Sequence, residues 1–396
     1  MMNLAIIGGG ASGMIAAIIA ARNGAKVTVF EKNDRLGKKL SATGNGRCNL
    51  SNVRLKYDGY NNPDFAKLII SGFDVTKTLE FFDNVGLKTY SDAEGRVYPV
   101  TDSANSVLDV LRFEIELLQV NVLCSSSVEK IIIDKNKPIV FLNGVGRSFD
   151  SVIVCAGGIV PSGELFPVKI AKTPIFPSLC PLVVNSPFIK GLSGTRAKVR
   201  ITLNDGEYSE FGEILFKNYG LSGIPIFNVS SVIAANFRNR ITHNFIRIDF
   251  FPKYNDNELK EMLVTRLIKY KDPERMFVGL MLNKIAHNLL TEFFGNIPSK
   301  ADCLGRISDF TIFIKNVLLP VSGLSSFGEG QVMSGGYDVS ELNDDLSLKK
   351  YPCVFLAGEI IDINGLCGGY NLQWAWSSGV ISAKSSIRYM KNADNQ

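Results

Sequence analysis

The sequence predicts an α/β protein in which a discontinuous dinucleotide-binding domain is interrupted by an inserted α+β domain. Three observations support this prediction. The first 31 residues follow a strand–turn–helix–strand pattern around a glycine-rich turn. Residues 353–390 return to a short apolar strand, a glycine-rich loop and a helix. Between them, from about residue 188, strands of alternating polarity mix with amphipathic helices. We therefore assign 1–187 and 335–396 to the first domain and 188–334 to the insert.

Composition favours a folded chain of two domains. The chain has 396 residues, of which 46% are apolar and 20% charged, and this excludes disordered and fibrous classes. The net charge of +5 comes from 43 basic and 38 acidic residues without a long run of one sign, so a nucleic-acid partner is not expected. Two histidines are too few for a multi-histidine site, and we expect no metal.

The cysteines and the apolar N-terminus favour a cytoplasmic protein. Seven cysteines without a C-x-x-C spacing indicate reduced thiols rather than disulfides or a zinc site. Residues 4–21 are mostly apolar, but four glycines and Ser12 interrupt them and no basic segment precedes them. We therefore expect neither a membrane span nor a signal peptide.

The N-terminal pattern reads as a right-handed βαβ unit. Residues 4–7 form the first strand, 14–22 the helix and 26–31 the second strand. The turn between them, Gly8 to Gly13, matches G-x-G-x-x-G. Gly8 permits the tight turn, Gly10 lets a pyrophosphate reach the backbone, and Gly13 lets the helix pack against the strand. Ala11 and Ser12 add N–H groups at the helix N-terminus, where a phosphate is stabilised.

Glu31, at the end of the second strand, decides which dinucleotide fits. It lies 18 residues after Gly13, where a carboxylate accepts hydrogen bonds from ribose hydroxyls. An acidic residue here disfavours a 2′-phosphate, so the adenosine belongs to FAD or NAD. A glycine-rich turn that binds nothing is the alternative.

The segment after Glu31 favours FAD over NAD. A plain NAD domain continues from this strand into a helix, whereas residues 35–52 form a basic, glycine-punctuated loop that can wrap a larger cofactor. Its charges suit a pyrophosphate and its glycines suit a flat ring. Arg47 can also reach a substrate carboxylate and is a catalytic candidate, although a solvated basic loop is the alternative. The cofactor candidates here are Lys32, Arg35, Lys38, Lys39, Thr43, Gly44, Asn45, Gly46 and Arg47.

Three motifs carry a resemblance that covers most of the chain. They are TGNGRCN at 43–49, AGEIIDINGLCGGYNLQWAWSSG at 357–379 and GEILFKNYGLSG at 212–223. Together they resemble the BaiN/RdsA-type FAD-dependent oxidoreductases of the glutathione-reductase-like flavoprotein clan. The resemblance implies an FAD-binding Rossmann-like domain with non-covalent, extended FAD. It also implies hydride transfer at flavin N5 and reduction of an activated C=C bond of a small molecule.

The resemblance also implies roles for residues that follow the N-terminal βαβ unit. Glu359 is expected near the ribityl or pyrophosphate groups, and the helix that starts at Tyr370 near the flavin's pyrimidine side. NAD(P)H is a possible transient donor, because no second G-x-G-x-x-G occurs in 160–352. The further cofactor candidates are Val128, Ala156, Gly157, Gly158, Gly358, Glu359, Gly369, Tyr370, Asn371 and Leu372.

Two departures from the family affect the catalytic assignment. The segment after Gly158 is short, and Asn218 stands where relatives often carry histidine before a Tyr-Gly-Leu-Ser-Gly run. Tyr219 is therefore the candidate proton donor, with a packed aromatic at a domain junction as the alternative. Three other functions stay open: a single-Rossmann NAD dehydrogenase, an RNA-modifying flavoprotein and a non-catalytic flavin-binding protein. The substrate, the donor, the oligomeric state and the role of Cys367 are not specified.

Overall fold

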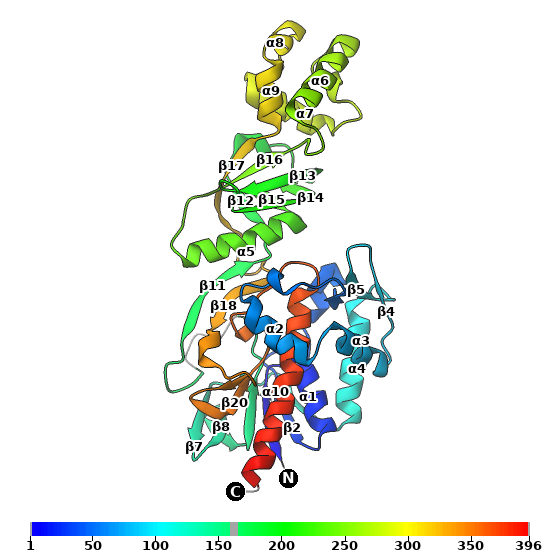
Figure 1. The fold of residues 1–396 in the computed structure, drawn as a ribbon. Helices are drawn as coiled ribbons and strands as arrows, with labels where there is room; N and C mark the ends of the chain where they lie inside the picture. The colour runs from blue at the N-terminus through cyan, green and yellow to red at the C-terminus, as the bar shows by residue number, and fades with distance from the viewer. Residues whose placement is uncertain (1, 159–164, 395–396) are drawn as a thin grey trace. The chain divides into compact units, whose positions relative to one another are not determined.

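The computed structural model describes residues 2–158 and 165–394 (Figure 1). The short segment that follows Gly158 begins with residues 159–164, which lie outside the described residues. Contacts divide the chain into two compact units, 1–176 with 332–396 and 177–331. The predicted boundary at 188 falls inside the second unit, because strand β12 (Leu182–Val184) already belongs to its barrel.

A six-stranded sheet forms the centre of the first unit, in the order β19-β20-β10-β1-β2-β6. All neighbouring strands are parallel except β19, which pairs antiparallel with β20. The four residues Leu4–Ile7 of β1 are all buried and alternate between the two faces. The strands are β1 (Asn3–Ile7), β2 (Lys26–Phe30), β6 (Asn121–Leu123), β10 (Ser151–Val154), β19 (Ser347–Leu348) and β20 (Tyr351–Leu356).

The N-terminal and C-terminal helices of the first unit pack against each other (Figure 1). A Cβ on Gly379 of α10 would lie 2.6 Å from the carbonyl oxygen of Ser12 in α1, so this crossing requires a glycine. The helical residues between 63 and 84 form two helices, because the Asp74 side chain accepts the N–H of Lys77 and caps a new helix. The helices are α1 (Ala11–Arg22), α2 (Pro63–Gly72), α3 (Val75–Asn84), α4 (Ala104–Leu117) and α10 (Tyr370–Asp394).

Small sheets complete the first unit. Strands β3 (Ser51–Asn52), β5 (Arg96–Pro99) and β4 (Thr89–Ser91) form one antiparallel sheet. Strands β7 (Lys130–Asp134), β8 (Lys137–Leu142) and β9 (Val145–Ser148) form another, and β11 (Lys172–Ser178) pairs with β18 (Val332–Tyr337). Short 3-10 helices are η1 (Leu40–Gly46), η2 (Tyr57–Gly59), η5 (Val339–Glu341) and η6 (Gly358–Ile360).

The second unit is a closed six-stranded barrel with helices, in the order β12-β15-β14-β13-β16-β17. Every neighbouring pair is antiparallel, as the alternating pattern predicts. Besides β12, its strands are β13 (Arg196–Leu203), β14 (Tyr208–Lys217), β15 (Gly220–Ser222), β16 (Asn244–Asp249) and β17 (Val317–Leu324).

The helices of the second unit share one apolar core with the barrel. Asn255 caps α6: its side chain accepts the N–H of Glu258 and completes a capping box. The helices are α5 (Ile224–Arg238), α6 (Asp256–Tyr270), α7 (Asn283–Phe294), α8 (Lys300–Gly305) and α9 (Ile307–Ile314), with η3 (Pro187–Ile189) and η4 (Arg275–Phe277).

The described residues contain neither a membrane-spanning helix nor a cluster of metal ligands. No helix within 2–158 or 165–394 has both the length and the apolar character to cross a bilayer. The same residues contain no group of three or more His, Cys, Asp or Glu side chains placed to hold a metal ion.

Candidate functional site

The turn between β1 and α1 is built around two interlocked glycines. Gly8 has φ +103°, and a Cβ there would lie 2.3 Å from the carbonyl oxygen of Cys155 at the end of β10. A Cβ on Gly13 would lie 1.9 Å from the carbonyl oxygen of Gly8. Both positions therefore exclude any side chain, and the helix starts in direct contact with the turn.

Gly10 differs from these two because its surroundings are open. A Cβ on Gly10 would meet nothing within 4 Å. Gly10 is the N-cap of α1, makes no side-chain cap bond, and no acidic residue follows in the first turn. The first N–H groups of a helix have no intrahelical partner, so those around Ala11 and Ser12 form a cradle for an anion.

Glu31, at the end of β2, lies beside this cradle and is buried. Its carboxylate accepts the N–H of Gly9 at 2.7 Å and the N–H of Asn33 at 2.8 Å. The Asn33 amide also donates to it at 2.6 Å. Glu31 thus fixes the glycine turn. Asn33 was not predicted as a site residue, because its role depends on the bend of the chain after β2.

Replacing Glu31 by glutamine is expected to lower stability and cofactor affinity together. The amide retains one acceptor but presents an NH₂ group to N–H donors, and a hydrogen bond to a charged group contributes about 1.5–3 kcal/mol. Denaturant unfolding of the cofactor-free protein and titration with FAD measure the two effects. The exposed Glu116 on α4 offers the control, because Glu116→Gln is expected to change neither. Parent-like values for Glu31→Gln would contradict this role.

Lys39 and Glu359 form an ion pair near the carboxyl ends of β10 and β20. The Lys39 ammonium lies 2.7 Å from Glu359, which also accepts the N–H of Met333 at 2.7 Å. A Cβ on Gly158 would lie 2.6 Å from the Met333 side chain, whereas one on Gly157 would have only Glu359 nearby, at 3.9 Å. Ligands of open α/β sheets bind at this end of the strands.

The loop after β2 contains more structure than predicted, but several of its basic residues point to solvent. Residues Leu40–Gly46 form η1, with Gly44 and Asn45 both in the left-handed region. Thr43 donates to the Leu40 carbonyl at 2.7 Å, which closes the turn locally. Lys32, Arg35 and Lys38 are exposed. Gly46 has φ +82° and open space around its Cα.

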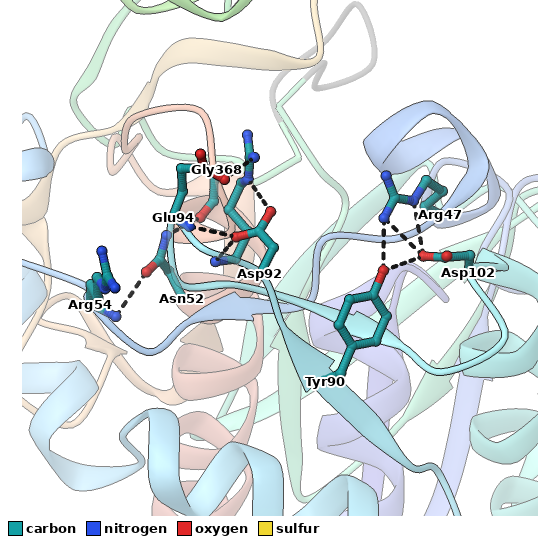
Figure 2. A network of polar contacts seen from close by, with 9 residues as sticks. Arg47, Asn52, Arg54, Tyr90, Asp92, Glu94, Asp102 and Gly368 are labelled. Atoms are coloured by element: carbon teal, nitrogen blue, oxygen red, sulfur yellow. Dashed lines mark hydrogen bonds and ion pairs between the residues drawn. The ribbon is translucent and has the colours of Figure 1, made fainter.

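Arg47 is held by an acid and a phenol (Figure 2). Its guanidinium lies 2.9 Å from Asp102 and donates to the Tyr90 hydroxyl at 2.9 Å, while Tyr90 donates to Asp102 at 2.8 Å. It also stacks 4.2 Å above the Tyr98 ring. The hydrogen bonds from Tyr90 and Arg47 lower the pKa of Asp102. Both charged partners are exposed, and the catalytic role of Arg47 stays a prediction.

A second polar network lies at the turn between β4 and β5 (Figure 2). Arg96 donates to Asp92 and to Glu94, each at 2.7 Å. Asn52 donates to the carbonyl of Gly368 at 3.0 Å and so ties β3 to the glycine pair before α10. These residues were not predicted as site residues, because no local pattern signals the pairing of residues 51–52 with 96–97.

The start of α10 is fixed by the loop before it. A Cβ on Gly369, which has φ +96°, would lie 2.2 Å from the Ser51 carbonyl oxygen. The Asn371 amide closes the preceding loop by accepting from Gly365 N–H at 2.9 Å and donating to its carbonyl at 2.8 Å. Tyr60 donates to the Tyr370 carbonyl at 2.8 Å, and Leu372 packs against the core. A fixed N-terminus can orient its dipole toward a ligand.

The remaining predicted residues lie at other positions. Val128 is buried just before β7. A Cβ on Gly358, with φ +77°, would lie 2.4 Å from the Ser12 hydroxyl, which places η6 beside α1. Ala156 follows β10 and packs on the core. Tyr219 belongs to the second unit. No disulfide joins any of the seven cysteines, all of which belong to the described residues, and burial raises the pKa of Cys155 to about 12.

The parallel sheet, the glycine turn, the uncapped helix start and the buried Glu31 define a Rossmann-type dinucleotide-binding protein. The model of the HI0933-like protein Rossmann domain matches residues 2–385, and the chain belongs to this family. The protein is an FAD-dependent oxidoreductase, and the resemblance to the BaiN/RdsA-type flavoproteins is confirmed.

The relatives match over nearly their full lengths. A 3-dehydro-bile acid delta(4,6)-reductase of Clostridium scindens is 33% identical over 407 residues, which cover 98% of this chain and 99% of the relative. A ribosomal RNA dihydrouridine synthase of Escherichia coli is 26% identical, with 96% and 98% covered. The enzyme of the same name from Haemophilus influenzae is 24% identical, with 97% and 98% covered.

Proposed function

We propose that the protein reduces an activated C=C bond of a small organic molecule, such as an enone, with electrons from NAD(P)H. The supporting observation is the full-length similarity to a reductase that acts on a 3-dehydro bile acid. Bound FAD supplies a flavin that accepts and donates a hydride. The residues that surround the glycine turn fit such a cofactor, because the open face of Gly10 leaves room for a pyrophosphate.

The cofactor-binding residues are proposed from their positions in the first unit. The start of α1 holds the pyrophosphate, and Glu31 accepts the ribose hydroxyls with its free lone pairs. Lys39 and Glu359, already paired, hold the middle of the cofactor. The N-terminus of α10 would lie beside the flavin's pyrimidine side, where its partial positive charge would stabilise a negative charge on the ring.

The proposed electron donor has no nucleotide-binding domain of its own in the second unit. Within 177–331 the fold is an antiparallel barrel with helices, whereas a nicotinamide domain of the Rossmann type requires a parallel sheet with its own glycine turn. NADH or NADPH would therefore bind only transiently, without a nucleotide-binding domain of its own in this unit.

A second candidate function is reduction of a uridine base in RNA. It is favoured by the two ribosomal RNA dihydrouridine synthases that match almost the whole chain. The chemistry is related, because dihydrouridine also arises by saturation of a conjugated C=C bond. Strongly salt-dependent RNA binding would favour this candidate over a small substrate.

We expect the purified protein to be yellow and to release FAD on denaturation. Stopped-flow mixing without oxygen then tests the two half-reactions separately. NADH or NADPH should reduce the flavin, and 3-oxochola-4,6-dienoic acid should reoxidise it. An RNA fragment rich in uridine tests the second candidate in the same assay. A reduced flavin that 3-oxochola-4,6-dienoic acid fails to reoxidise would overturn the proposed substrate class.

A further inference from the structure

The net charge of the chain is concentrated in the second unit. Residues 177–331 contain 18 basic and 14 acidic residues, a surplus of four, whereas the whole chain has a surplus of five. The balance of the whole chain gives no reason to expect a polyanionic partner, but a surplus within one unit can create a local positive face. The positions of these charges on the barrel decide whether such a face exists.

The outer face of strand β13 carries three of the basic side chains. Arg196, Lys198 and Arg200 occupy alternate positions of the strand and are exposed. Val199 and Ile201, which alternate with them, are buried in the core of the barrel. Successive side chains of a strand point to opposite faces, so the three basic residues form one row that points into solvent.

Two of these basic residues have no acidic partner. The acidic side chains on and beside this face are already paired, as Arg196–Glu213 at 2.6 Å, Arg247–Asp205 at 3.1 Å and Lys315–Asp249 at 2.9 Å. Within the part of the chain that the structure describes, neither Lys198 nor Arg200 forms an ion pair. Their positive charges are therefore available to the phosphates of a ligand.

Apolar side chains lie between the charges of the same face. Phe211 in β14 pairs directly with Arg200 across the two strands, and 47% of its surface is exposed. On the other side of β13, the guanidinium of Arg247 in β16 lies 5.2 Å from the centroid of the Phe245 ring. An exposed aromatic ring beside an unpaired cation is the combination that stacks a base and holds the neighbouring phosphate.

Helix α5 packs on the other side of β14. A Cβ on Gly212 would lie 2.6 Å from the side chain of Pro225 in α5, and Asn228 of the same helix donates to Glu210 at 3.0 Å. Gly212 and Glu210 flank Phe211 in the sequence and therefore point to the opposite face. The contacts of α5 with these two residues leave the ring of Phe211 free.

We propose that the outer face of β14, β13 and β16 binds a single-stranded segment of RNA. Phe211 stacks on an unpaired base, while Lys198 and Arg200 hold the phosphates beside it. The base must be unpaired, because neighbouring base pairs cover the flat faces of bases in a duplex. The proposal concerns the second unit alone, goes beyond the reduction of a small molecule, and supplies the second candidate function with an RNA-binding surface.

Fluorescence anisotropy of the FAD-loaded full chain with a short, labelled oligouridine measures the binding. Phe211→Ala should weaken it by roughly 5- to 150-fold, the effect of losing one stacked base. The double variant Lys198→Gln/Arg200→Gln should weaken it as well. It should also make the slope of the logarithm of the association constant against the logarithm of salt concentration shallower by about 1.4, because each phosphate contact of a single strand contributes about 0.7.

Matched variants elsewhere in the second unit provide the controls. Phe327 is a similarly exposed phenylalanine in the turn after β17, and Phe327→Ala should leave the affinity unchanged. Lys253→Gln/Lys284→Gln removes two exposed lysines from the same unit and should leave the salt slope at the parent value. Thermal unfolding shows whether each variant is folded, which is expected because every substituted side chain is exposed.

Three results would overturn the proposal. One is a parent protein that does not bind the oligouridine, and another is parent-like affinity in both Phe211→Ala and the double lysine–arginine variant. The third is a parent that binds an RNA duplex, single-stranded DNA or a poly-glutamate peptide as tightly as the single-stranded RNA. Reduction and reoxidation of the flavin are measured without RNA, so failure of this surface and failure of the small-molecule function give separate results.

Discussion

A Gly10→Val variant is expected to fold and to purify without FAD. Gly10 has φ −78°, which valine also adopts, and its Cβ position is free of protein atoms within 4 Å. The added side chain therefore clashes with nothing in the protein itself. It would occupy the space over the uncapped start of α1, where we place the pyrophosphate. The predicted effect is loss of the cofactor rather than loss of the fold.

The measurement is the ratio of flavin absorbance to protein absorbance after purification, together with thermal unfolding without FAD. Gly323→Val in β17 is a matched control. It adds the same side chain at another glycine with open surroundings, outside the first unit, and should keep its flavin. Gly10→Val that retains full flavin would show that the phosphate lies elsewhere.

The three glycines of the turn show which part of the site can be predicted from a local sequence motif. The fingerprint predicted a different role for each glycine, and the structure shows Gly8 and Gly13 enclosed by backbone while Gly10 is open. The packing of Gly8 and Gly13 follows from the motif because a local motif determines local geometry, while the cofactor-binding role of the three glycines stays a prediction. The pairing of Arg47 with Asp102 across the chain depends on tertiary structure, and no local pattern signals it.

The second unit shows the limit of periodicity more clearly. The alternating polarity of the insert predicted antiparallel strands, and β13 and β14 are the longest pair of them in the structure. Closure into a barrel needs the three-residue strands β12 and β15, which are too short to give a periodic signal. The same limit applies to the ion pair between Lys217 and Glu329. Residues so far apart in sequence meet only in the folded structure, so periodicity does not predict their contact.

The C-terminal helix α10 carries two tryptophans that point into different cores. Trp374 donates to the Gly358 carbonyl at 3.0 Å and packs on one face of the sheet. Trp376 donates to the Leu50 carbonyl at 3.0 Å and packs edge-on against Phe82, with ring centroids 5.1 Å apart. Both are buried, so their role in the fold is to hold the loops that end at Leu50 and begin at Gly358 against the helix.

Trp376→Ala is expected to lower the free energy of unfolding by about 3–5 kcal/mol, the usual cost of removing a buried tryptophan. The variant opens a cavity in the first unit and leaves the Leu50 carbonyl without its donor. Denaturant unfolding of the cofactor-free protein measures the loss. The exposed Phe113 on α4 provides the control, because Phe113→Ala should change stability by no more than about 0.5 kcal/mol. Equal stability of the two variants would mean that α10 is not anchored through Trp376.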